Sequence, residues 1–194
     1  MALKLITAPA AEPVSTSEAK SHLRVDTTAD DTYIGTLITV ARQNVESHLR
    51  RALISQTWEV VLDAFPAGVI RLPKPPLASV TSIKYTDDEG NESTYSSANY
   101  VVDTDTEPGR VVLKSGQTWP AVTLAAANGV RVRYVAGYGA AGSNVPQAIR
   151  QAILLVIGSL YENREDVLVA QGVSIGVLPF GVVALLAPYR IYGW

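Results

Sequence analysis

The spacing of apolar residues predicts helices at the two ends of the chain and strands between them. A first, short helix is expected from Ser15 to about Leu23, because the Ser15 hydroxyl and the Glu18 carboxylate fit a capping box. A longer helix is expected to begin at Asp30 and Asp31. Its apolar positions keep the 3.6-residue period of one buried helix face, and they are Ile34, Leu37, Ile38, Ala41, Val45 and Leu49.

The C-terminal part has a third predicted helix and an unusual tail. Asn144 and Pro146 suit the start of a helix that continues to about Tyr161, with an apolar stripe wider than one face. After Asp166 the only charged side chain is Arg190. Glycines and prolines interrupt this tail, so it cannot span a membrane, and either the rest of the chain or a neighbouring subunit should cover it. A short helix is expected over Val182 to Leu186.

The middle of the chain changes to the two-residue period of strands. Asp87 to Asn91 resembles a hairpin turn, since Gly90 and Asn91 favour positive φ. Prolines at 73, 75 and 76 mark an edge strand or a crossing connection. The expected strands are Thr57–Asp63, Val69–Leu72, Val80–Thr86, Tyr100–Asp103, Arg110–Leu113 and Val130–Val135.

These elements predict an α+β fold in which N-terminal and C-terminal helices form a core around a central antiparallel β-rich insertion, as a small sheet or a barrel. The expected domains are 1–54 (an extended arm and helices), 55–143 (the β-rich domain) and 144–194 (a helix and an apolar tail). The helical parts are expected to pack together. The N-terminus does not resemble a signal peptide, because it has no sustained apolar stretch.

Composition excludes several kinds of chemistry. The 194 residues include no cysteine, two histidines and one methionine, so a disulfide framework, a zinc knuckle or a Cys-His catalytic pair cannot be built. Only 18% of residues are charged and the net charge is -2, which argues against broad neutralisation of nucleic acid phosphates. We therefore expect no catalytic residue, no metal and no cofactor.

Four patterns invite a chemical interpretation that their surroundings weaken. Gly137 to Gly142 spells G-x-G-x-x-G, but no βαβ unit follows it, so we interpret it as a sharp turn from sheet to helix. Asp103 to Glu107 resembles the start of a calcium loop that lacks its last ligand. His22 and His48 lie on separate helices with no carboxylate cluster nearby in sequence. Arg42, Glu46 and Arg50 are expected to form a solvated row of ion pairs.

Short motifs in a fixed order give the chain a family resemblance. The first are Pro13-Val14-Ser15, Glu18-Ala19-Lys20, His22-Leu23-Arg24-Val25, Arg51-Ala52-Leu53-Ile54 and Gln56-Thr57-Trp58. Later ones are Ile70-Arg71-Leu72-Pro73, Pro75-Pro76-Leu77, Tyr134 to Gly139, Pro146-Gln147-Ala148-Ile149 and Tyr161-Glu162-Asn163-Arg164. In this order the chain resembles the gp6-like head-tail connector (adaptor) proteins of tailed bacteriophages and gene transfer agents.

The resemblance implies a structural protein that is not an enzyme. It implies a ring, usually of twelve subunits, in the virion neck below the portal protein and above a stopper or tail-completion protein, with DNA passing through the lumen without sequence-specific binding. Assembly would take place in the host cytoplasm, with no membrane involved. The alternatives are a nucleotide-binding or small-molecule-binding enzyme that uses Gly137 to Gly142, and another neck component such as a stopper.

The resemblance also implies that the C-terminal segment docks on the portal. The candidate partner-binding residues are Val182, Leu185, Leu186, Tyr189, Arg190, Ile191, Tyr192 and Trp194. The third predicted helix has apolar residues around more than one face, which suits contacts between subunits. The candidate interface residues are Leu154, Leu155, Tyr161 and Arg164.

Overall fold

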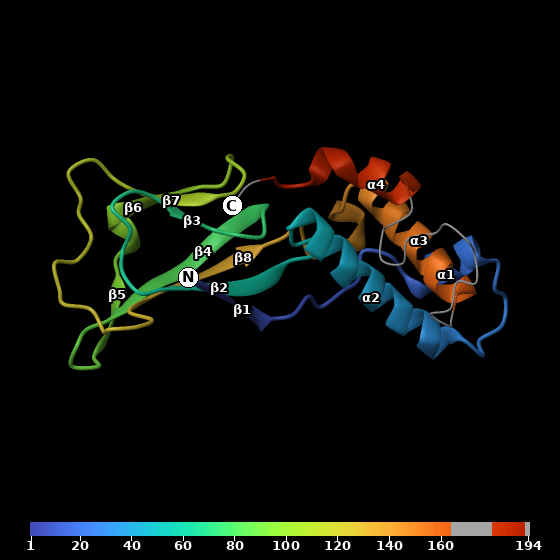
Figure 1. Ribbon diagram of the computed structural model, residues 1–194, viewed down its shortest axis with the longest axis horizontal. Helices are drawn as coiled ribbons and strands as arrows, with labels where there is room; N and C mark the ends of the chain where they lie inside the picture. Colours follow the sequence, from blue (N-terminus) through green and yellow to red (C-terminus); the bar gives the residue numbers. More distant parts are fainter. Residues whose placement is uncertain (164–179, 193–194) are drawn as a thin grey trace, which may run out of the picture. The chain divides into compact units, whose positions relative to one another are not determined.

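The computed structural model describes residues 1–163 and 180–192 and divides into two compact units. The sheet unit consists of Met1–Ala10 and Arg51–Ala140, and the helical unit consists of Ala11–Arg50 and Ala141–Trp194. The fold is α+β, as predicted (Figure 1). The first ten residues join the sheets because they form a strand there, whereas the sequence analysis grouped them with the helices as an extended arm.

Five strands form the larger sheet of the sheet unit, in the order β1-β2-β8-β4-β5 with every neighbouring pair antiparallel. β2, β4 and β8 correspond to expected strands, whereas β1 and β5 were not among them. The hairpin turn between β4 and β5 is where it was predicted. The strands are β1 (Ala2–Thr7), β2 (Gln56–Leu62), β4 (Leu77–Thr86), β5 (Glu92–Tyr95) and β8 (Val130–Ala136).

A second sheet, in the order β3-β7-β6, shares a core with the first. Its strands are β3 (Ile70–Arg71), β6 (Tyr100–Asp103) and β7 (Arg110–Leu113), and a 3-10 turn, η1 (Ser97–Asn99), precedes β6. Within the described residues the strands form two sheets and no closed barrel, so the sheet alternative is the correct one. The buried core includes Val60, Ile70, Ile83, Val111, Val130, Val132 and Tyr134.

Aromatic side chains add to this core. Phe65 stacks on Trp119 with ring centroids 4.7 Å apart, and Tyr95 lies 5.2 Å from the same indole. The Tyr95 hydroxyl donates a hydrogen bond of 2.8 Å to the carbonyl oxygen of Thr118. These contacts anchor the long segment between β7 and β8 to the sheets, because both the ring and the hydroxyl of Tyr95 hold it.

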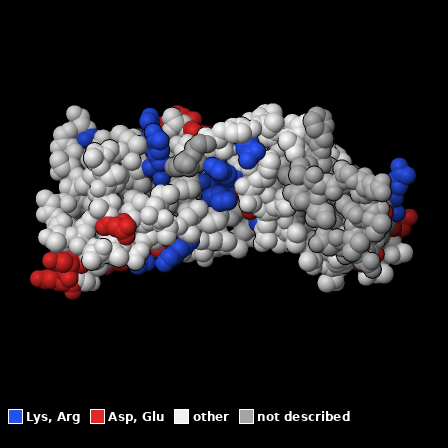
Figure 2. Space-filling model, viewed as in Figure 1, with Lys and Arg blue, Asp and Glu red and all other residues white. Residues whose placement is uncertain are grey.

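Charged groups are sparse on the face of the molecule in Figure 2. Acidic atoms gather at the lower left of that view, at the end of the sheet unit where the β4–β5 turn lies in Figure 1. This turn contains Asp87, Asp88 and Glu89.

The helical unit is built on the predicted helices. They are α1 (Thr16–Leu23), α2 (Asp31–Leu49), α3 (Gln147–Glu162) and α4 (Phe180–Leu186), with 3-10 turns η2 (Gly142–Asn144) and η3 (Ala187–Tyr189). α2 and α4 both pack on α3, and α1 contacts α2 and α3 (Figure 1). The core is formed by the predicted periodic positions of α2 together with Ile149, Ala152, Ile153, Val156 and Ile157 of α3.

The row Arg42, Glu46 and Arg50 is not solvated as predicted. Arg42 and Glu46 are 6% and 8% exposed, and only Arg50 lies in solvent. The Arg42 guanidinium donates to Glu46 at 3.0 Å and to Glu12 at 2.7 Å. Glu12 belongs to the segment before α1, so a carboxylate distant in sequence covers this side of α2 and buries the ion pair.

Candidate functional site

The N-terminus of α1 is fixed by the predicted capping box. The backbone N–H of Ser15 donates to the Glu18 carboxylate at 2.8 Å, and the N–H of Glu18 donates to the Ser15 hydroxyl at 3.2 Å. The hydrogen bond from the Ser15 backbone, followed by that from the Ser15 hydroxyl, lowers the pKa of Glu18, and nearby Arg150 adds to the effect. Glu18 is therefore a carboxylate held in one orientation at the start of α1.

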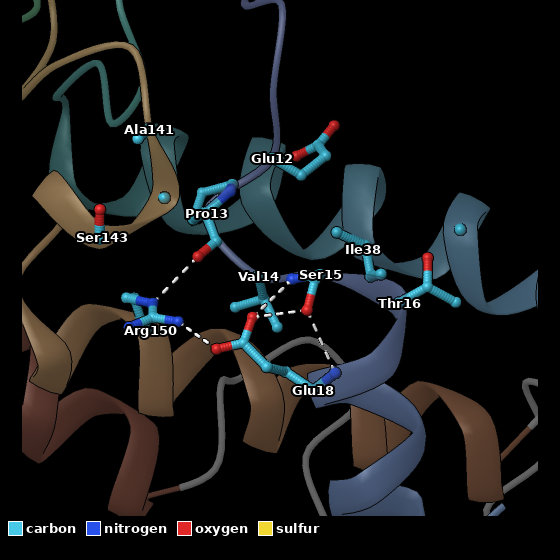
Figure 3. Close-up of a pocket in the computed structure, with 12 residues that line it drawn as sticks. Glu12, Pro13, Val14, Ser15, Thr16, Glu18, Ile38, Ala141, Ser143 and Arg150 are labelled. Atoms are coloured by element: carbon cyan, nitrogen blue, oxygen red, sulfur yellow. Dashed lines mark hydrogen bonds and ion pairs between the residues drawn. The ribbon is translucent and has the colours of Figure 1, made fainter. Parts of the chain in front are cut away.

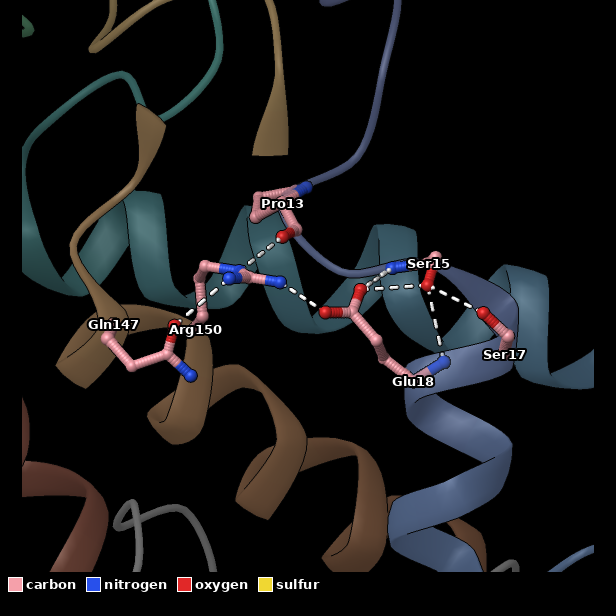
Figure 4. A network of polar contacts seen from close by, with 6 residues as sticks. All are labelled: Pro13, Ser15, Ser17, Glu18, Gln147 and Arg150. Carbon is pink, nitrogen blue, oxygen red and sulfur yellow. Dashed lines mark hydrogen bonds and ion pairs between the residues drawn. The ribbon is translucent and has the colours of Figure 1, made fainter. Parts of the chain in front are cut away.

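Arg150 of α3 joins three separate segments of the helical unit (Figure 4). Its Nε donates to the carbonyl oxygen of Pro13 at 3.0 Å, and its other nitrogens donate to the side chains of Gln147 and Glu18. No sequence pattern pointed to this residue. The available signal was a charged side chain within the apolar stretch of α3, and its partners could not be identified without the tertiary structure.

Two neighbouring cavities open around Arg150. The first has a volume of about 430 Å³ and lies between the segment before α1 and η2 (Figure 3). The second, of about 390 Å³, lies between α1 and α3, and both are lined by Val14, Glu18 and Arg150. The charged groups of these walls form ion pairs, Glu18 with Arg150 and Glu12 with Arg42.

The C-terminal segment packs on the helical unit. Val182 and Leu186 are fully buried, Leu185, Tyr189 and Ile191 are half-buried, and Arg190 and Tyr192 are exposed. The N–H of Ile191 donates to the carbonyl oxygen of Leu49 at 3.2 Å, at the end of α2. Trp194 lies outside the described residues. The predicted partner-binding residues thus separate into two that face the unit's own core and five that retain exposed surface.

The predicted interface residues lie on α3 with unequal surroundings. Leu154 and Leu155 are half-buried, and Leu154 lines the second cavity. The Tyr161 hydroxyl donates to Asp30 at 2.5 Å, and its ring lies 6.1 Å from that of Tyr33. Arg164 lies outside the described residues. Tyr161 therefore fastens the end of α3 to the start of α2 within one subunit.

His48 on α2 is a partly buried titratable side chain of the helical unit. Partial burial disfavours the charged imidazolium and, together with repulsion from Arg190, lowers the pKa of His48. Above the ordinary histidine pKa of about 6.5 the imidazole is neutral in both the folded and the unfolded chain, so titration of His48 does not lower the free energy of unfolding. As the pH falls through that value the unfolded chain takes up the proton first, so stability is lost.

We therefore expect a lower unfolding midpoint at pH 5.5 than at pH 7.5, and a smaller difference in His48→Gln. Denaturant unfolding at the two pH values measures the effect, with His22→Gln as the matched control. An equal pH dependence in wild type and His48→Gln would contradict the assignment to His48.

The glycine-rich loop is a turn whose amides are largely occupied. The N–H groups of Gly137, Tyr138 and Ala141 donate to Pro76, Leu53 and Asn144. α3 begins only at Gln147, so the loop does not open directly into a helix N-terminus as a phosphate-binding loop does. The interpretation as a sheet-to-helix turn agrees with this geometry.

The remaining motifs form local structure. Asp103 accepts hydrogen bonds from Asp105, Thr106 and Arg110, and Glu107 is paired with Arg51. In residues 1–163 and 180–192, no three acidic or histidine side chains are grouped so as to hold a metal ion. No helix in this described part is both long and apolar enough to cross a membrane.

Comparisons with known proteins match about half of the chain to a family. Residues 14–108 match the family described as "Phage gp6-like head-tail connector protein". No curated protein sequence matches the chain with statistical significance.

Solved structures extend the likeness to the full length. A chain from the "Neck of empty GTA particle computed with C6 symmetry" is 28% identical with a TM-score of 0.81, and one from the "Virion of native gene transfer agent (GTA) particle" is 26% identical with a TM-score of 0.82. A chain from the "Neck of native GTA particle computed with C12 symmetry" is 27% identical with a TM-score of 0.76. Each alignment covers 100% of this chain and 97% of the other. The family match over residues 14–108 and the full-length likeness to neck proteins identify this chain as a structural protein of the virion neck that is similar to the gp6-like head-tail connectors.

Proposed function

We propose that this protein forms a closed ring below the portal, through which the genome passes towards a stopper and the tail. The observation that supports this most is its full-length similarity to chains from necks computed with C6 and C12 symmetry. A cyclic ring of identical subunits needs two different patches on each chain that fit each other. Leu154 and Leu155, half-buried on α3, are candidates for one of them.

The C-terminal segment is the proposed portal-docking element. Val182 and Leu186 attach α4 to its own unit, so docking is assigned to the surface that stays exposed. Leu185, Arg190 and Tyr192 supply that surface, and Tyr192 is 70% exposed. Apolar and aromatic side chains of this kind dominate protein interfaces when a partner buries them.

We expect the double variant Leu185→Glu/Tyr192→Ala to bind the portal at least tenfold more weakly than the wild type. Loss of two apolar contacts removes more than the ~1.4 kcal/mol that a tenfold change in affinity requires. Binding is measured with purified portal by mass photometry, and rings on the portal are imaged by electron microscopy.

Val40→Glu is the matched control for this experiment, because Val40 is an exposed apolar residue on α2 of the same unit. The thermal midpoints of both variants should stay near that of the wild type. Equal portal binding by wild type and double variant would overturn docking through this segment. Rings that assemble elsewhere in the neck would instead favour a stopper or tail-completion role.

A further inference from the structure

One face of the larger sheet carries a cluster of cationic side chains. The strand register pairs Lys4 with Glu59, Glu59 with Arg133, and Arg131 with Lys84. Side chains of directly paired residues share a face of the sheet, as do those two apart on one strand. The four cations therefore lie on one face, together with Glu92, whose carboxylate accepts from Lys84 at 2.6 Å. We call Lys4, Lys84, Arg131 and Arg133 the basic sheet face.

The carboxylate of Glu59 lies beneath this face and orients two of its cations. Only 6% of the Glu59 side chain is exposed, whereas 40% of Arg131 and 45% of Arg133 is exposed. Glu59 accepts from Nε and a terminal nitrogen of Arg133 at 3.2 and 2.8 Å, and lies 3.5 Å from Arg131. The anion is thus covered, while the guanidinium groups that it holds still reach the surface.

The basic sheet face is the side of the larger sheet opposite the core. The other side of the same strands carries the apolar core shared with the second sheet, including Val60, Ile83 and Val132. The basic sheet face extends over β1, β2, β8 and β4, a width of about 14 Å at the usual strand spacing. Cations arranged at this density suit a partner that presents carboxylates or phosphates.

The same chain carries a matching anionic feature, the acidic turn, defined as Asp87, Asp88 and Glu89. Asp87 accepts hydrogen bonds from the backbone N–H groups of Glu89 and Asn91, so it maintains the shape of the turn. Asp88 and Glu89 are exposed, at the end of the sheet unit where acidic atoms gather in Figure 2. Among the described residues, neither Asp88 nor Glu89 forms an ion pair, whereas most other acids of the sheet unit pair with a cation of the same unit.

We propose that the acidic turn of one subunit docks on the basic sheet face of the next copy in the ring. The contact rests on the ring under Proposed function, in which each chain meets a copy through two different patches. Opposite charges on those patches would set the order of subunits and exclude self-pairing of like surfaces. A second copy is favoured over DNA because one chain supplies both complementary surfaces, and DNA requires only the basic one.

Charge reversal on either side tests the contact in assembled particles. We expect Asp88→Lys/Glu89→Lys to reduce the copies of this protein per particle at least fivefold, as measured by mass spectrometry against the capsid protein. Lys4→Glu/Lys84→Glu should do the same. It retains both arginines over Glu59 but removes the ion pair between Lys84 and Glu92. All four substitutions together should restore incorporation, because the charges again oppose each other. Thermal unfolding of each purified chain verifies its fold.

Asp105→Lys is the matched control, since Asp105 is an exposed acid in the other acidic loop of the same unit, and its copy number should stay at the wild-type value. Failure of the four-fold variant to recover would overturn the contact. A basic-face variant that is incorporated normally but changes the DNA content of particles would overturn it in favour of DNA. Absence of the wild-type protein from the neck would overturn the proposed function together with this contact.

Discussion

Replacing Arg42 by alanine should lower the free energy of unfolding by about 3–5 kcal/mol, the usual cost of removing one partner from a buried ion pair. Arg42 lies between Glu12 and Glu46, and 8% of its side chain is exposed. Without the guanidinium, the mostly buried carboxylate of Glu46 loses a cation that lies 3.0 Å away. Denaturant unfolding at pH 7.5 measures the loss.

Two further variants separate charge from packing. Adding Glu46→Gln to Arg42→Ala should recover part of the loss, because a neutral amide tolerates burial better than a carboxylate. Gln43→Ala, at an exposed position of the same helix, should change stability by less than about 0.5 kcal/mol. A loss below about 1 kcal/mol in Arg42→Ala would mean that water replaces the guanidinium without cost.

Gly137→Ala should destabilise the sheet unit by more than about 2 kcal/mol, because it combines a strained backbone with overpacking. Gly137 has φ of +132°, which side-chain-bearing residues rarely adopt. A Cβ placed there would lie 2.5 Å from the carbonyl carbon of Ile54 and 2.6 Å from the nitrogen of Ser55. Urea unfolding followed by tryptophan fluorescence measures the effect, since Trp58 and Trp119 lie in this unit.

Gly90→Ala isolates the backbone contribution. Gly90 also has a positive φ, of +90°, but no atom lies within 4 Å of the added Cβ. The cost there should be limited to about 1–2 kcal/mol of backbone strain. Equal losses in the two variants would indicate that the Ile54–Ser55 backbone moves aside freely.

Local features of the sequence were sufficient to predict the helices. The capping box at Ser15 and Glu18 and the periodic apolar positions of α2 depend on residues within a few turns of one another. Such signals need no knowledge of the tertiary structure, so the predicted ends lie within a residue or two of the observed ones.

The strands at the borders of the larger sheet were harder to predict. β1 is exposed along almost its whole length, and Leu5 and Ile6 face solvent, so no alternation of buried and exposed residues marks it. β5 is short and polar, and only Tyr95 is buried. An edge strand that covers little core lacks the two-residue pattern by which strands are recognised.

Long-range pairing explains the rest of what the sequence analysis missed. Arg42 is paired with Glu12, which lies thirty positions earlier in the sequence. Lys84 faces Arg131 only because β4 pairs with β8 in one particular register. Arg150 likewise depends on Pro13 and Glu18. Neither spacing nor composition encodes such partners, since tertiary structure alone brings them together.

The chain passes from one unit to the other three times, after Ala10, Arg50 and Ala140. Neither unit is therefore one continuous segment of the chain. A single break of the backbone at any of these crossings leaves the units joined covalently by the other two. A subunit that is cut at one crossing would therefore keep both of its units attached. Limited proteolysis at one crossing should accordingly yield fragments that separate only under denaturing conditions.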